Sequence, residues 1–320
     1  MLTADTPPDE QPTLILLGGQ PGAGKSSLTR AVLDQHTAPI IPLSGDDLQK
    51  FYPDYAGLVT QAPLEAGPIL AEATSVWVRD AITHALDTRR SLLLEGTFHT
   101  PEVALNTAQR FKDAGYQTRI IAVATPRHQS LLSATARYLQ DRISGKPARF
   151  TSLATHDRGW HGTRALIARL DGAAHVDRAS VMYRDGTTQY DVLRSPGQAA
   201  ATDPPFRGAA EELDKARAAN RVPGRNNLWL SDLRRVTRAV AENGELSPQM
   251  GELLIALHDE ALRTVVPALN LPAESTSAPI LVDNISKNRA VIIDALRNMR
   301  QEAPSSAPSG PDPEPPTISR

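Results

Sequence analysis

One glycine-rich segment near the N-terminus constrains this 320-residue chain more than any other feature. An apolar run at residues 13–17 leads into it, and helical spacing follows it at residues 25–35. It fits the pattern GxxxxGK[ST], and its residues are Gly19, Gln20, Pro21, Gly22, Ala23, Gly24, Lys25 and Ser26, with Ser27 next. Its glycines let the backbone turn tightly and aim several N–H groups at one point, beside a positive helix N-terminus.

The pattern in this context predicts a phosphate-binding loop for a nucleoside triphosphate, either ATP or GTP. In such loops the lysine, here Lys25, reaches the β- and γ-phosphates, and the hydroxyl of the next residue, here Ser26, binds Mg²⁺. The loop itself does not say what happens to the γ-phosphate.

Short strands and longer helices alternate through the first 142 residues. Apolar runs predict strands at 13–17, 40–43, 91–94 and 119–124, and helical spacing predicts helices at 25–35, 71–88, 101–114 and 126–142. Such alternation is typical of α/β proteins with a parallel sheet covered on both faces. We therefore expect a P-loop kinase-like fold with a doubly wound parallel sheet.

Beyond residue 142 the pattern is looser. We expect a short helix at 162–170, and a hairpin between 181–183 and 189–193 around the turn dipeptide Asp185-Gly186. The kinase domain is then predicted to span 13–195. The turn-rich stretch 222–227 carries no predicted chemistry.

The rest of the chain divides by composition. Residues 196–205 are predicted to be a linker and 206–301 a helical extension, with helices at 209–219, 228–242, 248–266 and 284–300. Of the 26 prolines, three fall in residues 1–12 and six in 302–320, so both ends are predicted to be disordered tails. The extension is expected to pack on the kinase core, and the alternative is a module for a partner or for self-inhibition.

Composition excludes several other classes of function. The chain has no cysteine, which rules out disulfides, a thiol nucleophile and cysteine-ligated zinc. With 34 basic and 36 acidic residues, it lacks the positive surplus of a general nucleic-acid binder. No apolar run approaches the length of a membrane span, and the acidic N-terminus does not resemble a secretory signal. We therefore expect a cytoplasmic protein with neither a nucleic-acid nor a membrane partner.

Two groups of carboxylates follow predicted strands, at the edge of the sheet where ligands bind in such folds. Asp46 and Asp47 come after the second strand, and Glu95 ends the third. A carboxylate there can accept the proton of a substrate hydroxyl. The alternatives are an N-cap for Asp46 and Asp47 and a hydrogen-bonded carboxylate that shapes a turn for Glu95. No apolar run ending in Asp supplies a Walker-B aspartate, so Mg²⁺ would depend on Ser26 and one of these carboxylates.

Phosphoryl transfer also needs cations over the group in transit. Arg137, late in a predicted helix, and Arg149, in the loop beyond it, stand where many small kinases bring arginines over the phosphates. The alternative for each is an ordinary solvated arginine.

The order of these motifs resembles the zeta toxins of epsilon/zeta toxin–antitoxin systems. These proteins are P-loop kinases that phosphorylate the sugar hydroxyl of UDP-N-acetylglucosamine. The resemblance runs from about residue 13 to about 195, through GGQPGAGKSS at 18–27, SGDDLQKFYP at 44–53, LLEGT at 93–97 and ARY at 136–138.

The resemblance implies roles for individual residues. Asp46 takes the position of the catalytic base, and Arg137 and Arg149 take those of the γ-phosphate clamps. The residues implied to line a sugar-nucleotide pocket are Asp80, Glu95, Thr97 and Thr107. The resemblance also implies a small antitoxin protein as a partner.

The chain departs from the family at several positions. Phe98-His99 follows the EGT segment where the family has Gly-Arg, and that arginine helps to hold the substrate. Asp80 stands for a glutamate, Ser44 for an acid and Tyr52 for a histidine. Two alternatives therefore stay open: a kinase of another small molecule such as a nucleotide, cofactor or antibiotic, and an ATP-binding regulator that acts through its C-terminal helices.

Overall fold

The computed structural model describes residues 8–36, 38–195, 204–219, 224–269, 271 and 276–302. Its strands are β1 (Thr13–Gly18), β2 (Ile41–Ser44), β3 (Leu92–Gly96), β4 (Gln117–Val123), β5 (Arg178–Met182) and β6 (Thr188–Leu193). Its α-helices are α1 (Lys25–Asp34), α2 (Gly45–Gln49), α3 (Tyr55–Gln61), α4 (Ala66–Asp87), α5 (Pro101–Asp113), α6 (Arg127–Ile143), α7 (Leu153–Ala168), α8 (Ala209–Ala218), α9 (Arg225–Glu242), α10 (Pro248–Glu260) and α11 (Ser277–Glu302).

The strands form one sheet in the order β2-β3-β1-β4-β5-β6. All neighbours are parallel except β6, which returns antiparallel to β5 as the hairpin around Gly186. Strand β1 lies between β3 and β4, so the loop that follows Gly18 leaves the middle of the sheet at its carboxyl edge. The predicted α/β class with a P-loop kinase-like sheet is confirmed.

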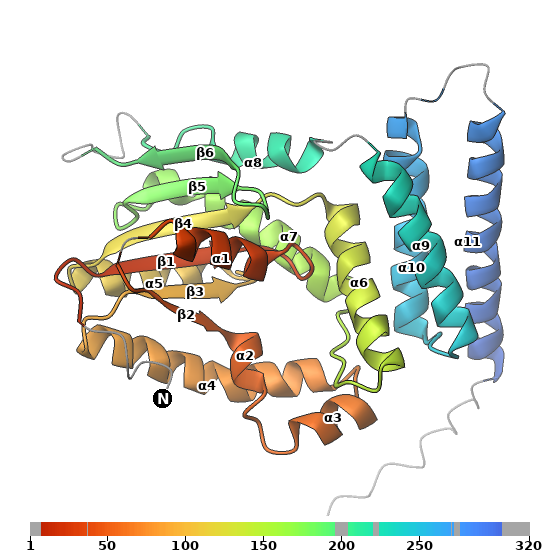
Figure 1. Ribbon diagram of the computed structural model, residues 1–320, viewed down its shortest axis with the longest axis horizontal. Coiled ribbons are helices and arrows are strands. Elements are labelled where there is room, and N and C mark those ends of the chain that lie inside the picture. The colour runs from red at the N-terminus through yellow and green to blue at the C-terminus, as the bar shows by residue number, and fades with distance from the viewer. Residues whose placement is uncertain are drawn as a thin grey trace, which may run out of the picture.

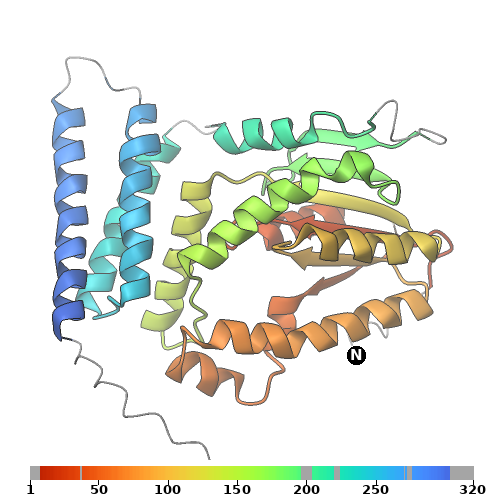
Figure 2. The same ribbon diagram turned by 180° about the vertical axis from the view of Figure 1, so that it is seen from behind.

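Helices cover both faces of this sheet (Figures 1 and 2). Side chains of β1 alternate between the faces, as in any strand. Leu14 and Leu16 pack into the core beneath α4, α5 and α7, whereas Ile15 and Leu17 pack against α1. This double burial explains why β1 is continuously apolar in sequence.

The predicted helical extension divides into two parts. Helix α8 packs on the sheet, since Phe206 and Leu213 belong to the core beneath α5 and α7. Helices α9, α10 and α11 stand together to one side of the sheet (Figure 1) and share a separate core with α6. Helices α9, α10 and α11 therefore contact the kinase domain mainly through α6, whereas α8 contacts α7, β5 and β6.

Several boundaries differ from the expectations; helix α4, for example, begins at Ala66 instead of residue 71. The short helix expected at 162–170 is part of α7, which begins at Leu153. Residues 8–12, expected in a disordered tail, are tied to the sheet: Ser91 Oγ donates to the Asp9 carboxylate at 2.8 Å, and Gln117 N donates to Pro12 O at 2.9 Å. The described part of α11 includes Glu302. Residues 1–7, most of the predicted linker (196–203) and residues 303–320 of the predicted tail lie outside the described residues.

Within the described residues, no helix is both long enough and apolar enough to cross a membrane.

Candidate active site

The glycine-rich loop joins β1 to α1 and depends on two glycines in the left-handed region. Gly22 has φ +76° and Gly24 has φ +90°. A Cβ on Gly22 would lie 2.0 Å from the carbonyl oxygen of Ser130 on α6, and one on Gly24 would lie 2.9 Å from Cβ of Arg184. Because glycine adopts these angles without a steric penalty, the backbone N–H groups of the loop can turn toward a phosphate.

Two side chains of the loop face the interior instead of a ligand. Gln20 is fully buried, and its Nε2 donates to Thr125 O and to Ser130 Oγ, each at 3.0 Å. Ala23 is also fully buried, against α1 and β1. Both residues were predicted to bind the cofactor, and only their backbone atoms are available for that.

Lys25 opens α1 and turns its ammonium back over the loop. Its Nζ donates to Gly19 O at 3.0 Å. Burial lowers the pKa of Lys25, the nearby Arg137 and Arg149 add to the lowering, and the carboxylates of Asp46 and Glu95 oppose it. Lys25 is thus within electrostatic reach of Asp46, Glu95, Arg137 and Arg149.

Asp46 lies in the first turn of α2 and pairs with Arg149. Arg149 Nη1 donates to Asp46 Oδ1 at 2.7 Å and to Gln49 Oε1 at 2.9 Å. The N-cap interpretation of Asp46 is wrong, because Ser44 Oγ caps this helix by accepting from Asp46 N. Partial burial would raise the pKa of Asp46, but Arg149 and Lys25 outweigh it and the pKa is lowered. Asp46 is therefore a carboxylate at neutral pH.

Glu95 is the penultimate residue of β3 and is hydrogen-bonded, as its alternative interpretation predicted. Thr29 on α1, one turn after Lys25, donates its hydroxyl to Glu95 Oε1 at 2.5 Å. The half-buried carboxylate still acts electrostatically on Lys25. Glu95 thus joins β3 to α1 beneath the loop.

Arg137 lies exposed on α6, and its charge reaches both Lys25 and Asp46. The other predicted substrate residues have no described hydrogen bond to Lys25 or Asp46. Asp80 is exposed on α4, Thr97 is half-buried after β3, and Thr107 Oγ1 donates to Val103 O within α5. Among the hydrogen bonds of the described residues, none joins these three to Lys25 or Asp46, so their role stays a prediction.

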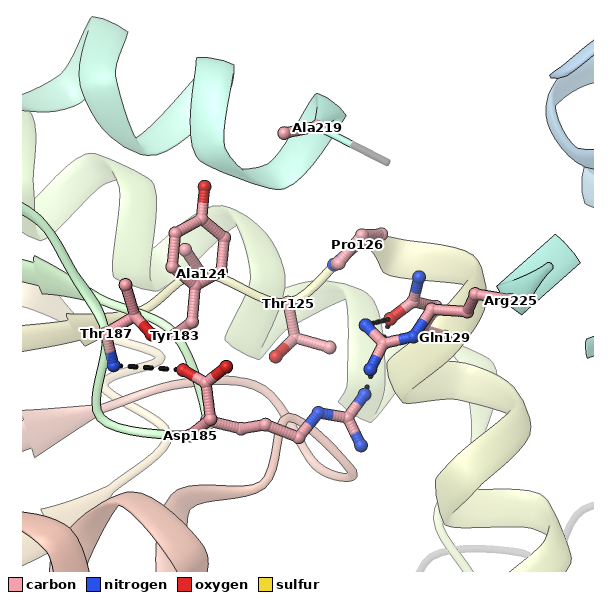
Figure 3. A pocket seen from close by; sticks show the side chains of 10 residues that line it. Ala124, Thr125, Pro126, Gln129, Tyr183, Asp185, Thr187, Ala219 and Arg225 are labelled. Atoms are coloured by element: carbon pink, nitrogen blue, oxygen red, sulfur yellow. Dashed lines mark hydrogen bonds between the residues drawn. The ribbon is translucent and has the colours of Figure 1, made fainter. Parts of the chain in front are cut away.

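A cavity of about 260 Å³ lies next to the loop (Figure 3). Its wall combines the segment after β4, the hairpin turn, the end of α8 and the start of α9. The residues that line it are Ala124, Thr125, Pro126, Gln129, Tyr183, Arg184, Asp185, Thr187, Ala219 and Arg225. Arg225 Nη1 and Arg184 Nη2 both donate to Gln129 Oε1, at 3.1 and 3.4 Å.

This cavity is not predicted by the sequence. Arg225 lies in the turn-rich stretch 222–227, which carries no predicted chemistry, and Arg184 is only the neighbour of the turn dipeptide Asp185-Gly186. The one available signal was the position of Arg184 directly after a strand of the sheet, at the edge where ligands bind.

The comparisons with known proteins bear on this site. The family model for the zeta toxins matches residues 1–193. The chain belongs to the zeta toxin family. It is 30% identical over 200 residues to Toxin PezT of Streptococcus pneumoniae, and the aligned region covers 62% of this chain and 79% of that toxin. It is 27% identical over 189 residues to Toxin zeta of Enterococcus hirae, and the aligned region covers 58% of this chain and 66% of that toxin.

A solved structure agrees on the fold. The structure from the study of the PezAT chromosomal toxin–antitoxin system of Streptococcus pneumoniae superposes with a TM-score of 0.56 at 24% identity, over 75% of this chain and 91% of that one. This chain therefore shares the P-loop kinase-like fold, and its helices α8–α11 follow the residues that the family model matches.

The departure from the zeta toxin pattern at Phe98-His99 has a structural basis. Phe98 has φ +44°, which is uncommon for a residue with a side chain. Its ring packs on Gly18 and Gly96, where any Cβ would overlap it, at 2.3 and 2.7 Å. Burial, followed by the charges of Arg158 and Lys25, lowers the pKa of His99. His99 is therefore a neutral imidazole at neutral pH, at the position where the resemblance implies an arginine.

A chain of polar contacts runs from the loop to the C-terminal helices. Gln20 donates to Ser130 Oγ, which lies 2.9 Å from Nε2 of the buried His156. His156 Nδ1 lies 3.0 Å from Asp157 Oδ1. Arg127 then bridges Asp157 and Glu260 of α10, with Nη1 at 2.7 Å from Glu260 Oε1. These contacts join α6, α7 and α10 behind the loop.

This network predicts acid sensitivity. Burial lowers the pKa of His156 below 6.5, although Asp157 opposes this. Burial would raise the pKa of Asp157, but the hydrogen bonds and charges of His156 and Arg127 outweigh burial and lower this pKa to about 2. The contribution of neutral His156 to stability is therefore complete above about pH 6.5 and is lost as the pH falls below that value. The contribution of ionised Asp157 is complete above about pH 3.8 and is lost only below it.

We expect the midpoint temperature of thermal unfolding to decrease as the pH is lowered from about 7 to about 5. This decrease should be less steep in a His156→Gln variant. The slopes are compared rather than the midpoints, because the substitution itself costs stability. His161→Gln, which changes an exposed histidine, is the control and should keep the wild-type slope. Equal slopes in His156→Gln and wild type would contradict the prediction.

Proposed function

We propose that this zeta toxin family member is a kinase that transfers the γ-phosphoryl group of ATP, or GTP, to a hydroxyl. One observation carries the proposal: an ionised aspartate, Asp46, bonded to Arg149, lies close enough to Lys25 of the loop to alter its pKa. A base, a cation and a phosphate cradle are the parts that this chemistry requires. Positioning and charge stabilisation then supply most of the rate.

Each group has a role in the proposed reaction. The loop amides and Lys25 hold the phosphates. Asp46 orients the acceptor hydroxyl and receives its proton as the new P–O bond forms and the bond to the β-phosphate oxygen breaks. Arg137 and Arg149 stabilise the charge on the group in transit. Arg149 would exchange Asp46 for the γ-phosphate, which frees the carboxylate for the acceptor.

The nucleotide is supported by space as well as by charge. The cavity in Figure 3 shares Arg184 with the wall of the loop at Gly24, so a nucleotide whose phosphates lie on the loop can extend its base into it. Its lining combines apolar side chains with polar ones such as Gln129 and Arg225, which suits the apolar faces and polar edges of a nucleobase.

Magnesium fits the oxygen donors near the loop. The hydroxyl of Ser26, at the exposed start of α1, and a carboxylate, Glu95 or Asp46, are the hard donors that Mg²⁺ prefers. When bound, the ion neutralises charge on the β- and γ-phosphates.

The leading acceptor is UDP-N-acetylglucosamine or a related sugar nucleotide, and the loss of a cell-wall precursor would make the activity toxic. Family membership and the order of the matched motifs support this choice. The Phe98-His99 segment favours the alternative of another small hydroxyl acceptor, because it replaces a substrate-holding arginine of the family by a neutral group. A protein antitoxin that covers the nucleotide site is the partner that the toxin–antitoxin system of the relative suggests.

Growth of bacteria that express the chain tests the proposal in cells. We expect arrest by the wild type and relief by Lys25→Ala or Asp46→Asn. Lys50→Ala, which removes an exposed lysine paired with Asp47 at 2.8 Å, is the matched control and should still arrest growth. Arrest by Asp46→Asn equal to wild type would instead support a regulator that binds ATP without turnover.

A further inference from the structure

The two proposed clamp arginines belong to elements whose core is built by the C-terminal helices. Tyr138, next to Arg137, is 6% exposed, and Phe150, next to Arg149, is 9% exposed. Their rings meet edge to face with centroids 5.2 Å apart. Both belong to the core formed with α9, α10 and α11, and neither belongs to the two cores of the sheet.

One side chain from the extension, Glu245, is bonded directly to α6, the helix that carries Arg137. The carboxylate of Glu245, 18% exposed, accepts from Tyr138 Oη at 3.4 Å and from Arg142 Nε at 3.2 Å. Arg142 in turn donates through Nη1 to Thr60 O at the end of α3. Glu245 thus holds two residues of the last turns of α6, just before the segment with Arg149.

The backbone holds Glu245 in place. The residue lies between α9 and α10, where Gly244 has φ +65° and Glu245 N donates to Val240 O at 3.0 Å, as in a common helix C-terminal motif. Ser247 then caps α10 by accepting from Met250 N. Because the two helix ends hold the backbone of Glu245, its side chain loses little conformational freedom when it binds Tyr138 and Arg142.

We propose that Glu245 is a positioning residue that sets Arg137 and Arg149 over the phosphates through Tyr138 and Arg142. The C-terminal helices are therefore part of the catalytic machinery, although they lie outside the region matched by the family. This inference rests on the proposed kinase function. It would make turnover sensitive to a residue that touches neither nucleotide nor acceptor.

Two measurements on the full chain test this inference. The variants are Glu245→Ala and Glu245→Gln, with Arg289→Ala as the matched control. Arg289 pairs with Asp259 at 2.7 Å between α10 and α11 with similar partial exposure, and none of its described hydrogen bonds reaches α6. All variants are first compared by thermal midpoint.

Amide hydrogen exchange of residues 138–150 is the first measurement. Glu245→Ala should raise exchange there by about tenfold, and Arg289→Ala should leave it near wild type. The second is turnover with ATP and the best acceptor. Glu245→Ala should lower kcat by roughly tenfold or more with the KM for ATP changed by less than about threefold, because small misplacements of catalytic groups are costly. Glu245→Gln should fall between Glu245→Ala and wild type.

Different results would overturn the positioning role of Glu245 and the kinase function. Unchanged exchange in Glu245→Ala, or equal loss of kcat in Arg289→Ala, would overturn the positioning role. A wild-type chain without any turnover would overturn the kinase proposal, whatever the exchange of residues 138–150 shows.

Discussion

Replacing Asp46 with asparagine is expected to lower turnover by roughly 10²–10⁴-fold while ATP affinity stays within about threefold of wild type. Asparagine keeps the size of the side chain but cannot take a proton from the acceptor hydroxyl. Asparagine also lacks the charge that pairs with Arg149, whose Nη1 lies 2.7 Å from Asp46 Oδ1. This loss affects the position of Arg149 in the nucleotide-free protein more than it affects ATP binding. The measurement is steady-state turnover with ATP titrated, together with equilibrium binding of ATP.

Asp47→Asn is the matched control for this prediction. Asp47 is the next residue of α2, exposed, and paired with Lys50 instead of an arginine of the site. Its loss should change turnover by less than about twofold, because exposed ion pairs contribute little. Equal losses in the two variants would show that the charge of α2 matters in general and that Asp46 is not the base.

Replacing Gly22 with alanine is expected to reduce ATP affinity by about tenfold or more. The new Cβ would lie 2.0 Å from Ser130 O, a backbone atom of α6 that cannot rotate away, so the loop or the helix must move. Loss of even one N–H bond to a charged phosphate costs about 1.5–3 kcal/mol, which is tenfold or more in affinity. ATP binding by calorimetry measures the effect.

Gly115→Ala separates this overlap from backbone strain. Gly115 has φ +81°, close to that of Gly22, but a Cβ there meets nothing within 4 Å. Both variants carry the cost of a left-handed residue, about 1–2 kcal/mol of unfolding free energy. ATP affinity equal to wild type is expected for Gly115→Ala, and a similar affinity for Gly22→Ala would contradict the steric argument.

Local sequence signals predicted the sheet and the loop because each depends on neighbouring residues. The apolar runs of β1, β3 and β4 and the glycines of the loop are complete within a few positions. Helix α7 was only half predicted, because Gly159 and Gly162 lower helix propensity. The structure uses both for close packing: Cβ atoms there would lie 3.1 Å from Gln20 Cα and 2.3 Å from Phe98 O.

Contacts between distant residues could not be predicted from one sequence. Asp46 and Arg149 stood out individually, but their 2.7 Å pairing needs β2, α2 and the loop after α6 in three dimensions. Arg225 and Glu245 had no local signal at all, since their partners Gln129 and Tyr138 lie about a hundred positions earlier on α6. The role of α6 as the meeting point of sheet and extension appears only when the cores are known.

Transfer of a γ-phosphoryl group to a hydroxyl is tested most directly by product analysis with the purified full chain. The chain is incubated with ATP, Mg²⁺ and UDP-N-acetylglucosamine, in parallel with other hydroxyl acceptors, and the products are identified by mass spectrometry and phosphorus NMR. We expect an acceptor that gains one phosphate on a sugar hydroxyl as ADP forms, and no such product with Asp46→Asn. Turnover of another acceptor alone would support the alternative substrate, whereas no phosphorylated acceptor from a wild-type chain that binds ATP would contradict the proposed kinase function.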